Sequence, residues 1–288
     1  MEGVLMNAET NEDNDYVYIV KKKNSTTWFK KLLSLFKPKK IFFYKDGVLQ
    51  NIKHISYGLK NVKIIIHYYD DNVLHRKNKP AIIEYYYNGN IEKEIYYNNG
   101  KIHRKNGPAI ILYHRCGVDN KNEVFYYCND ELHREDGPAR IKYFDNKVTL
   151  EEYYYHGKLH REDGPAIICN SLNDGKTIKK KYYKNDRLHN DNGPAIIEYN
   201  ESGYLERFGI LFILSDRPTF NVKKEEYYQN NKLHKFDGPA VIEYGDNNKI
   251  KLEQHYYNGI KFIPEELPFE FPIDDSKKEL YFNLKHGV

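Results

Sequence analysis

Histidine, arginine and a carboxylate fall within four residues of one another at several places in this chain. His133-Arg134-Glu135-Asp136-Gly137-Pro138-Ala139 is one such place. These side chains could transfer a proton or bind a metal ion, because imidazole and carboxylate serve in both kinds of site. The motif, a histidine followed five residues later by Pro-Ala, occurs six times, with histidines His75, His103, His133, His160, His189 and His234.

Comparison of the copies argues against catalysis and metal binding. The carboxylate is present as Asp136, Asp163 and Asp237, and asparagine replaces it in the other three copies. A general base or metal ligand needs its charge in every copy, whereas a turn position accepts either residue. Copies about 28 residues apart also supply no second metal ligand nearby. We therefore predict that each histidine hydrogen-bonds the backbone of a turn, and that these residues form no metal site.

Other signatures of catalysis are missing from the sequence. There is no GxSxG, no Walker A loop, no HExxH and no GxGxxG that follows a strand. The three cysteines (Cys116, Cys128 and Cys169) form no CxxC pair, so we predict neither a disulfide framework nor a zinc site. We predict a non-enzymatic protein with no catalytic residues and no cofactor, in a reducing, intracellular compartment.

The spacing of the motif indicates the elements that carry it. The histidines lie 28, 30, 27, 29 and 45 residues apart. Within one period, β-rich runs at 82–86 and 91–97 are separated by Asn88-Gly89, and Asn98-Asn99-Gly100 precedes a short third segment. Asn-Gly between β-rich runs favours a type I′ hairpin turn. Helical periodicity is absent from 41–262. We predict an all-β fold, an elongated antiparallel β-meander of about six repeats of about 28 residues.

Tyrosine is the most unusual feature of the composition, with 28 Tyr and 14 Phe against one Trp. Adjacent tyrosines recur through the array, and alternation along a strand would place one ring on each face of the sheet. The two ladders of rings could be the core of a single-layer sheet, or one of them could be a continuous binding stripe. The pairs are Tyr68-Tyr69, Tyr96-Tyr97, Tyr126-Tyr127, Tyr154-Tyr155, Tyr182-Tyr183, Tyr227-Tyr228 and Tyr256-Tyr257.

The Tyr-Tyr-x-Asn-Gly-x-Leu pattern resembles MORN-type repeats, particularly the bacterial variant of YwqK-like antitoxin proteins. The longer Leu-His-Arg-Glu-Asp-Gly-Pro-Ala, at 132–139 and 159–166, resembles uncharacterised repeat proteins of large DNA viruses. The resemblance covers about 41–262, although the period is longer than that of standard MORN units. It implies a β-hairpin array that binds proteins or membranes without an activity of its own, and by analogy a virion or an infected cell.

The N-terminal 40 residues differ from the array. Residues 1–15 are acidic and predicted to be disordered, with no signal peptide, and residues 16–40 are basic. The segment 27–37 has the pattern of an amphipathic helix, with Pro38 as a stop. This helix could dock on an anionic membrane or a partner's groove, or cover the first edge of the sheet. Its candidate docking residues are Trp28, Phe29, Leu32, Leu33, Phe36, Lys30, Lys31 and Lys37.

Two further segments interrupt the period. The 45-residue spacing implies an insertion of about 17 residues between Tyr199 and Glu225, whose apolar run 208–214 is either a buried strand or an exposed contact loop. Residues 263–288, rich in proline, acids and aromatics, are expected to cap the array. The predicted organisation is therefore 1–15, 16–40, a repeat array over 41–262, and a tail over 263–288.

Charge narrows the class of partner. The net charge is +4, of which +3 belongs to residues 1–40, so the array is nearly neutral. A nucleic-acid binder usually carries a basic excess in its binding domain, so we do not expect one here. No apolar run approaches 18 residues, so no membrane-spanning helix is predicted.

The leading expectation is a cytoplasmic interaction or scaffold protein that binds a protein partner. The alternatives are membrane docking through the N-terminal helix and, more weakly, nucleotide or single-stranded nucleic-acid binding on tyrosine. The sequence leaves the oligomeric state open.

Overall fold

The computed structural model describes residues 8–10, 16–21, 40–45, 48–57, 62–86, 88–115, 121–200, 204–207, 210–213, 222–235, 237–245 and 248–264. Regular elements in these ranges are all β-strands, and none is an α-helix, so the all-β prediction is confirmed. The chain divides into two compact units. The first unit is Met1–Arg134 with Ala139–Asn146, and the second is Glu135–Pro138 with Lys147–Val288.

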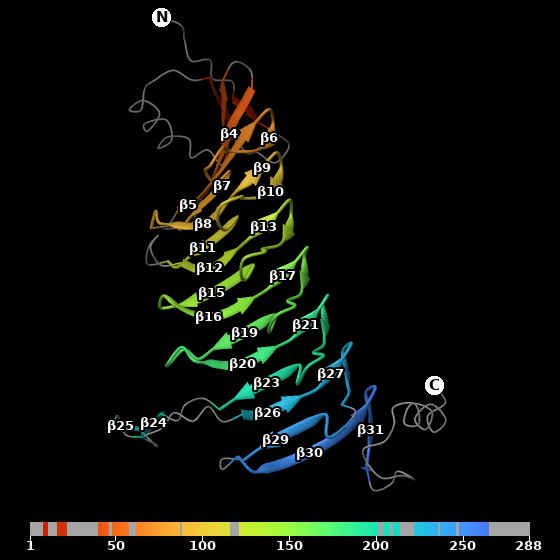
Figure 1. Ribbon diagram of the computed structural model, residues 1–288. Helices are drawn as coiled ribbons and strands as arrows, with labels where there is room; N and C mark the ends of the chain where they lie inside the picture. Colours follow the sequence, from red (N-terminus) through yellow and green to blue (C-terminus); the bar gives the residue numbers. More distant parts are fainter. Residues whose placement is uncertain are drawn as a thin grey trace, which may run out of the picture. The chain divides into compact units, whose positions relative to one another are not determined.

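In the first unit, strands that follow one another in the sequence pair with their neighbours as an antiparallel meander (Figure 1). The one described exception is the parallel pair β2–β3. Ile111, for example, lies between Glu94 on one neighbouring strand and Val124 on the other. The sheet strands are β1 (Ala8–Thr10), β2 (Tyr16–Lys21), β3 (Lys40–Lys45), β4 (Val48–Tyr57), β5 (Val62–Asp70), β7 (Ile82–Tyr85), β8 (Ile91–Ile95), β11 (Ile110–Tyr113), β12 (Lys121–Phe125) and β15 (Arg140–Phe144).

The second unit has the same organisation. Ile197 lies between Lys180 on one neighbouring strand and Glu225 on the other. The antiparallel meander predicted for the array is thus confirmed within each unit. Its sheet strands are β16 (Lys147–Glu152), β19 (Ile167–Asn170), β20 (Thr177–Lys181), β23 (Ile196–Tyr199), β26 (Val222–Glu226), β29 (Val241–Tyr244) and β30 (Ile250–Tyr257), followed by β31 (Ile260–Phe262).

Short hairpins alternate with pairs of sheet strands. Each forms a two-stranded ladder of its own at one end of the sheet strands (Figure 1). Those of the first unit are β9 (Tyr97–Asn98) with β10 (Lys101–Ile102) and β13 (Tyr127–Cys128) with β14 (Glu131–Leu132), and β6 (Val73–Leu74) pairs with the end of β5. Those of the second unit are β17 (Tyr154–Tyr155) with β18 (Lys158–Leu159), β21 (Tyr183–Lys184) with β22 (Arg187–Leu188), and β27 (Tyr228–Gln229) with β28 (Lys232–Leu233).

The apolar insertion forms β25 (Ile210–Ile213), which pairs antiparallel with β24 (Tyr204–Arg207). These two strands make a separate two-stranded sheet. Tyr204 pairs with Ile213 and Arg207 with Ile210. The sequence allowed a buried strand or an exposed contact loop for this run; its residues 210–213 form a strand, and the burial of that strand stays a prediction.

Hairpin turns explain why asparagine, aspartate and glycine recur between the short strands. Asn99 and Gly100 have φ angles of 48° and 79°, and Asn129 and Asp130 have 51° and 72°. Positive φ at both central residues defines the type I′ turn, which asparagine, aspartate and glycine adopt most easily. The predicted turn at Asn88-Gly89 is different, because only Gly89 of that pair has a positive φ. There the Gly89 N–H donates to the Tyr86 carbonyl (2.9 Å), as in a longer loop that ends in a bulge.

A fully buried alanine joins each motif to the sheet. The Ala109 N–H donates to the Phe125 carbonyl (2.8 Å), and its own carbonyl accepts from the Tyr96 N–H (2.8 Å). These two bonds hold the start of β11 between a sheet strand and a hairpin. A larger side chain would have no space, because all six alanines are 0% exposed: Ala81, Ala109, Ala139, Ala166, Ala195 and Ala240.

Four of the seven tyrosine pairs are placed differently from the prediction. In these pairs the first tyrosine lies at the break between a sheet strand and a hairpin, as Tyr96 does between β8 and β9. Tyr68-Tyr69 and Tyr256-Tyr257, in contrast, lie within the continuous strands β5 and β30. The pair predicted at Tyr154-Tyr155 is shifted by one residue, because Tyr153 donates its N–H to Ala166 and fills the position of Tyr96. Because residues 153–155 are all tyrosine, the sequence pattern could not show which of them begins the hairpin.

Candidate functional site

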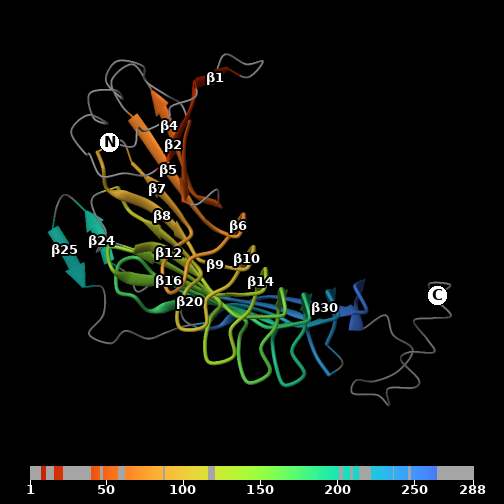
Figure 2. The ribbon, with the colours of Figure 1, turned by 90° about the horizontal axis from the view of Figure 1, so that it is seen from above.

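Each motif copy forms a loop that leaves a hairpin, projects from the sheet and returns to the next sheet strand (Figure 2). The histidine at the start of the loop accepts a hydrogen bond at Nδ1 from the backbone of the next hairpin turn. The donors, with N–H to Nδ1 given as the N···N distance, are Asn99 to His75 (3.1 Å), Asn129 to His103 (3.4 Å), Asn185 to His160 (3.3 Å), Asn230 to His189 (3.4 Å) and Asn258 to His234 (3.2 Å).

A second hydrogen bond joins successive hairpins. The Gly100 N–H donates to the Leu74 carbonyl (2.9 Å), and the Asp186 N–H donates to the Leu159 carbonyl (2.9 Å). Where the turn residue is aspartate or asparagine, its side chain accepts in return, as Asp186 Oδ1 does from the Leu159 N–H (2.8 Å). These histidines therefore link neighbouring copies, and the hydrogen bond at Nδ1 orients each imidazole ring. In His189, acceptance at Nδ1 leaves the proton on Nε2, which bonds Asp191 (2.8 Å).

The residue after the histidine stacks on the first tyrosine of its own copy. The cation lies 3.8–4.0 Å from the centre of the ring, the geometry of a cation–π contact. The sequence analysis missed this pairing, because the two residues lie eight positions apart across a hairpin. The pairs are Arg76 on Tyr68, Arg104 on Tyr96, Arg134 on Tyr126, Arg161 on Tyr153 and Lys235 on Tyr227.

The same position also closes the loop. Arg104 donates from Nη1 to the carbonyl of Pro108, four residues on (3.1 Å), and Arg161 does so to Pro165 (3.4 Å). In the fifth copy Asn190 replaces the arginine and donates from Nδ2 to the Pro194 carbonyl (2.9 Å). The loop is thus closed in this copy as well, but the copy has no arginine or lysine at this position to lie over Tyr182.

The residues that vary between copies lie at the tips of the loops. Wherever the structure describes them, the second and third positions after the histidine are exposed, and in the fourth copy the side chains of Glu162 and Asp163 are 87% and 88% exposed. Asp163 accepts from Nε of Arg161 (3.3 Å). The predicted turn positions Asp136 and Asp237 are also exposed loop residues. The residues that are the same in every copy (the histidine, proline and alanine) therefore form the frame of each loop, and the second and third positions, which vary, face solvent.

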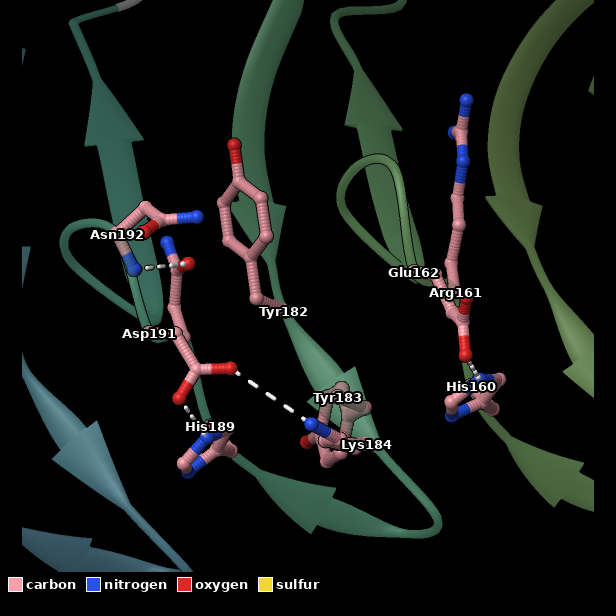
Figure 3. A pocket seen from close by; sticks show the side chains of 10 residues that line it. His160, Arg161, Glu162, Tyr182, Tyr183, Lys184, His189, Asp191 and Asn192 are labelled. Carbon is pink, nitrogen blue, oxygen red and sulfur yellow. Dashed lines mark hydrogen bonds and ion pairs between the residues drawn. The ribbon is translucent and has the colours of Figure 1, made fainter.

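Grooves lie between successive loops of the second unit. One, of about 310 Å³, lies between the loops that begin at His160 and His189 (Figure 3). The next, of about 440 Å³, shares Asn190, Asp191 and Asn192 with it and is bounded on the far side by Tyr227 and Lys235. The first unit has a similar groove of about 330 Å³ beside Tyr68 and Arg76. Each groove combines tyrosine rings, a histidine and polar loop residues.

Charge differs between the loops of the two units. The first two loops are basic, through Arg76, Lys77 and Lys79 in one and Arg104 and Lys105 in the other. In the second unit, Glu162 and Asp163 outweigh Arg161, and the next loop carries Asp191 without an adjacent cation in the motif. The hydrogen bond from His189 and the nearby Lys184 hold the pKa of Asp191 below its usual value, so this carboxylate is charged at neutral pH.

Burial raises the pKa of several tyrosines that line the grooves. It raises the pKa of Tyr227 to about 12, with the carboxylate of Glu225 adding to the effect. Burial likewise raises the pKa of the Cys169 thiol, which disfavours the reactive thiolate. Within the described ranges, no three His, Cys, Asp or Glu side chains converge in a way that could hold a metal ion.

The remaining predicted site residues belong to the N-terminal segment. The candidate docking residues of the N-terminal helix, 28–33 with Phe36 and Lys37, lie outside the described residues, as does 265–288 of the tail. Within residues 1–15, Ala8–Thr10 form β1. The part of the chain that the structure describes contains no helix long and apolar enough to cross a membrane.

No protein-family model matches this chain, and no curated protein is significantly similar to it.

Proposed function

We propose that this chain is a non-catalytic interaction protein that binds a protein partner along the grooves between its motif loops. The observation that supports this most directly is that different positions of each copy have different roles. The histidine, proline and alanine hold the frame, and the second and third positions after the histidine, which change from copy to copy, are exposed at the loop tips where the structure describes them. Repeat proteins commonly bind in this way, with variable residues displayed on a constant frame.

The lining of the grooves supports the same proposal. Tyrosine provides a large, rigid contact area with a hydroxyl that tolerates water, and short polar residues beside it supply hydrogen bonds. In the second unit, Tyr182, Tyr183 and Asn192 line one groove, and Tyr227 and Tyr228 line the next. A partner with an extended segment could contact both, because the grooves share the loop from Asn190 to Asn192. The resemblance to MORN-type repeats favours the same class of function.

The test compares two lysine substitutions in the full-length chain. Glu162→Lys changes an exposed loop tip beside a groove, and Glu253→Lys changes an exposed glutamate in sheet strand β30. Tagged protein is recovered, after cross-linking, from the cells that produce it, and partners are quantified. We expect Glu162→Lys to lower the recovery of specific partners at least several-fold, and Glu253→Lys to leave it unchanged. Equal recovery with the wild-type chain and both variants would contradict the proposal.

A further inference from the structure

The fifth motif copy lacks an interaction that its neighbours make. In five copies an arginine or lysine of the chain lies over the first tyrosine, with the cation 3.8–4.0 Å from the ring centre. In the fifth copy the corresponding residues are Tyr182 and Asn190, and an amide carries no cation to place there. Tyr182 thus makes the same backbone hydrogen bonds as its counterparts, to Ala195 and His189, but without the cation of its own copy.

The side chain of Asn190 hydrogen-bonds the backbone of its own loop. Its Nδ2 donates to the Pro194 carbonyl (2.9 Å), and its Oδ1 accepts from the Asn192 N–H (3.1 Å). These bonds fix the short side chain against its own loop. Tyr182 is consequently part of the lining of the groove of about 310 Å³, where Figure 3 shows its ring between Asn192 on one side and Arg161 on the other.

Two cations already line this groove, and both have partners. Arg161 lies 3.9 Å from the ring centre of Tyr153 and donates to Asp163, and Lys184 pairs with Asp191 (3.7 Å). Glu162, in contrast, has no arginine or lysine partner in the described part of the chain, and its contact with His160 (3.8 Å) is an ion pair only when that ring is protonated. The groove thus offers an aromatic face and an exposed carboxylate.

We propose that this groove receives an arginine side chain of the protein partner. The guanidinium would lie over Tyr182 as Arg161 lies over Tyr153, and Glu162 would supply the opposite charge. Arginine fits better than lysine, because a planar guanidinium stacks on an aromatic ring and can also bond a carboxylate. This inference rests on the proposed function and specifies the partner's chemistry at one of its grooves.

The binding test uses two short, unstructured peptides of the same sequence. One contains a single arginine, and the other contains citrulline, which has the same shape without the charge. The full-length chain is labelled with ¹³C at its tyrosine rings, and Tyr182→Phe identifies the Tyr182 signal. We expect the arginine peptide to shift that signal in a saturable way. The citrulline peptide should bind about 3- to 30-fold more weakly, the range expected for a cation–π contact.

Two opposite substitutions test the geometry. Asn190→Arg supplies the missing guanidinium from the chain itself and can keep the bond to Pro194, as Arg161 does to Pro165. We expect it to abolish the response of Tyr182 without loss of stability. Lys235→Asn uncovers Tyr227 in the neighbouring groove, and we expect the Tyr227 signal to gain a response to the arginine peptide. Because one variant loses binding and the other gains it, a general folding defect cannot produce both results.

The inference is overturned if the citrulline peptide binds as well as the arginine peptide, or if Asn190→Arg responds like the wild-type chain. Partner recovery separates this failure from that of the proposed function. If Glu162→Lys still loses partners while Asn190→Arg keeps them, the interaction function stands and the arginine site does not. If neither variant loses partners, both fail.

Discussion

Arg104 makes two contacts within its loop, over the ring of Tyr96 at 3.8 Å and to the carbonyl of Pro108 at 3.1 Å. The equivalent asparagine, Asn190, keeps only the second. This accounts for the sequence drift at the position after the histidine. Several residue types can close the loop, but only a cation can cover the ring.

Substitution at Arg104 should separate these contacts. We expect Arg104→Ala to lower the free energy of unfolding by about 1–2 kcal/mol, because it removes both. Arg104→Asn should recover roughly 1 kcal/mol of that loss, because its amide can reach the proline carbonyl as Asn190 does. Urea denaturation measures both, with Lys105→Ala at the exposed neighbouring position as the control. Equal losses for alanine and asparagine would show that loop closure contributes nothing.

The hairpin turns require left-handed backbone at two adjacent residues, and glycine meets this need in two places with different surroundings. A Cβ on Gly100 would lie 2.9 Å from Cγ1 of Val73, whereas one on Gly157 would meet nothing within 4 Å. Their φ angles are similar, +79° and +75°, so the backbone strain of a substitution should be nearly the same.

We therefore expect Gly157→Ala to cost about 1 kcal/mol, from backbone strain alone. Gly100→Ala should cost more, roughly 2–3 kcal/mol, because the side chain of Val73 must also move. The measurement is the shift of the denaturation midpoint in the full-length chain. A double variant, Gly100→Ala with Val73→Ala, provides the control, since it removes the clash and should recover part of the loss. Equal costs at the two glycines would contradict this account.

At the element scale, sequence reasoning found the strands and most of the turns. Asparagine, aspartate and glycine marked the hairpins because few residues tolerate positive φ, and this preference is local. The sequence could not show that Asn88-Gly89 forms a longer loop, since the same dipeptide suits both structures. It also could not show the Tyr182 groove, because the groove depends on which loop lies beside which ring after folding.

At the scale of the whole molecule, partly buried tyrosines are numerous in both units. Burial is the largest cause of a raised pKa at Tyr69, Tyr85, Tyr96, Tyr97, Tyr113, Tyr183, Tyr227, Tyr228 and Tyr244. Nearby carboxylates add to the effect, as Glu94 does by accepting a hydrogen bond from Tyr113 (2.9 Å). The folded protein therefore retains phenolic protons that the unfolded chain releases.

This predicts a loss of stability in alkali. Above pH 10 the unfolded chain binds fewer protons than the folded one, so stability falls as the pH rises from about 10 towards 12, and is unaffected by these groups below pH 10. Thermal unfolding at pH 9, 10 and 11 measures the decline. Tyr227→Phe should make it shallower, since it removes a group whose pKa is raised to about 12. Tyr155→Phe, at a ring that is 49% exposed, is the control. Stability that stays constant over this range would refute the prediction.

The hydrogen bonds between neighbouring hairpins also bear on how such a gene can change. A copy offers a histidine Nδ1 and a leucine or isoleucine carbonyl to the copy after it, and presents two turn N–H groups to the copy before it. Each end of a copy thus complements the opposite end of any other. Unequal recombination within the coding sequence, adding or deleting one period in frame, would rejoin matching ends. The protein can therefore lengthen or shorten by whole copies, and the number of its grooves changes in step.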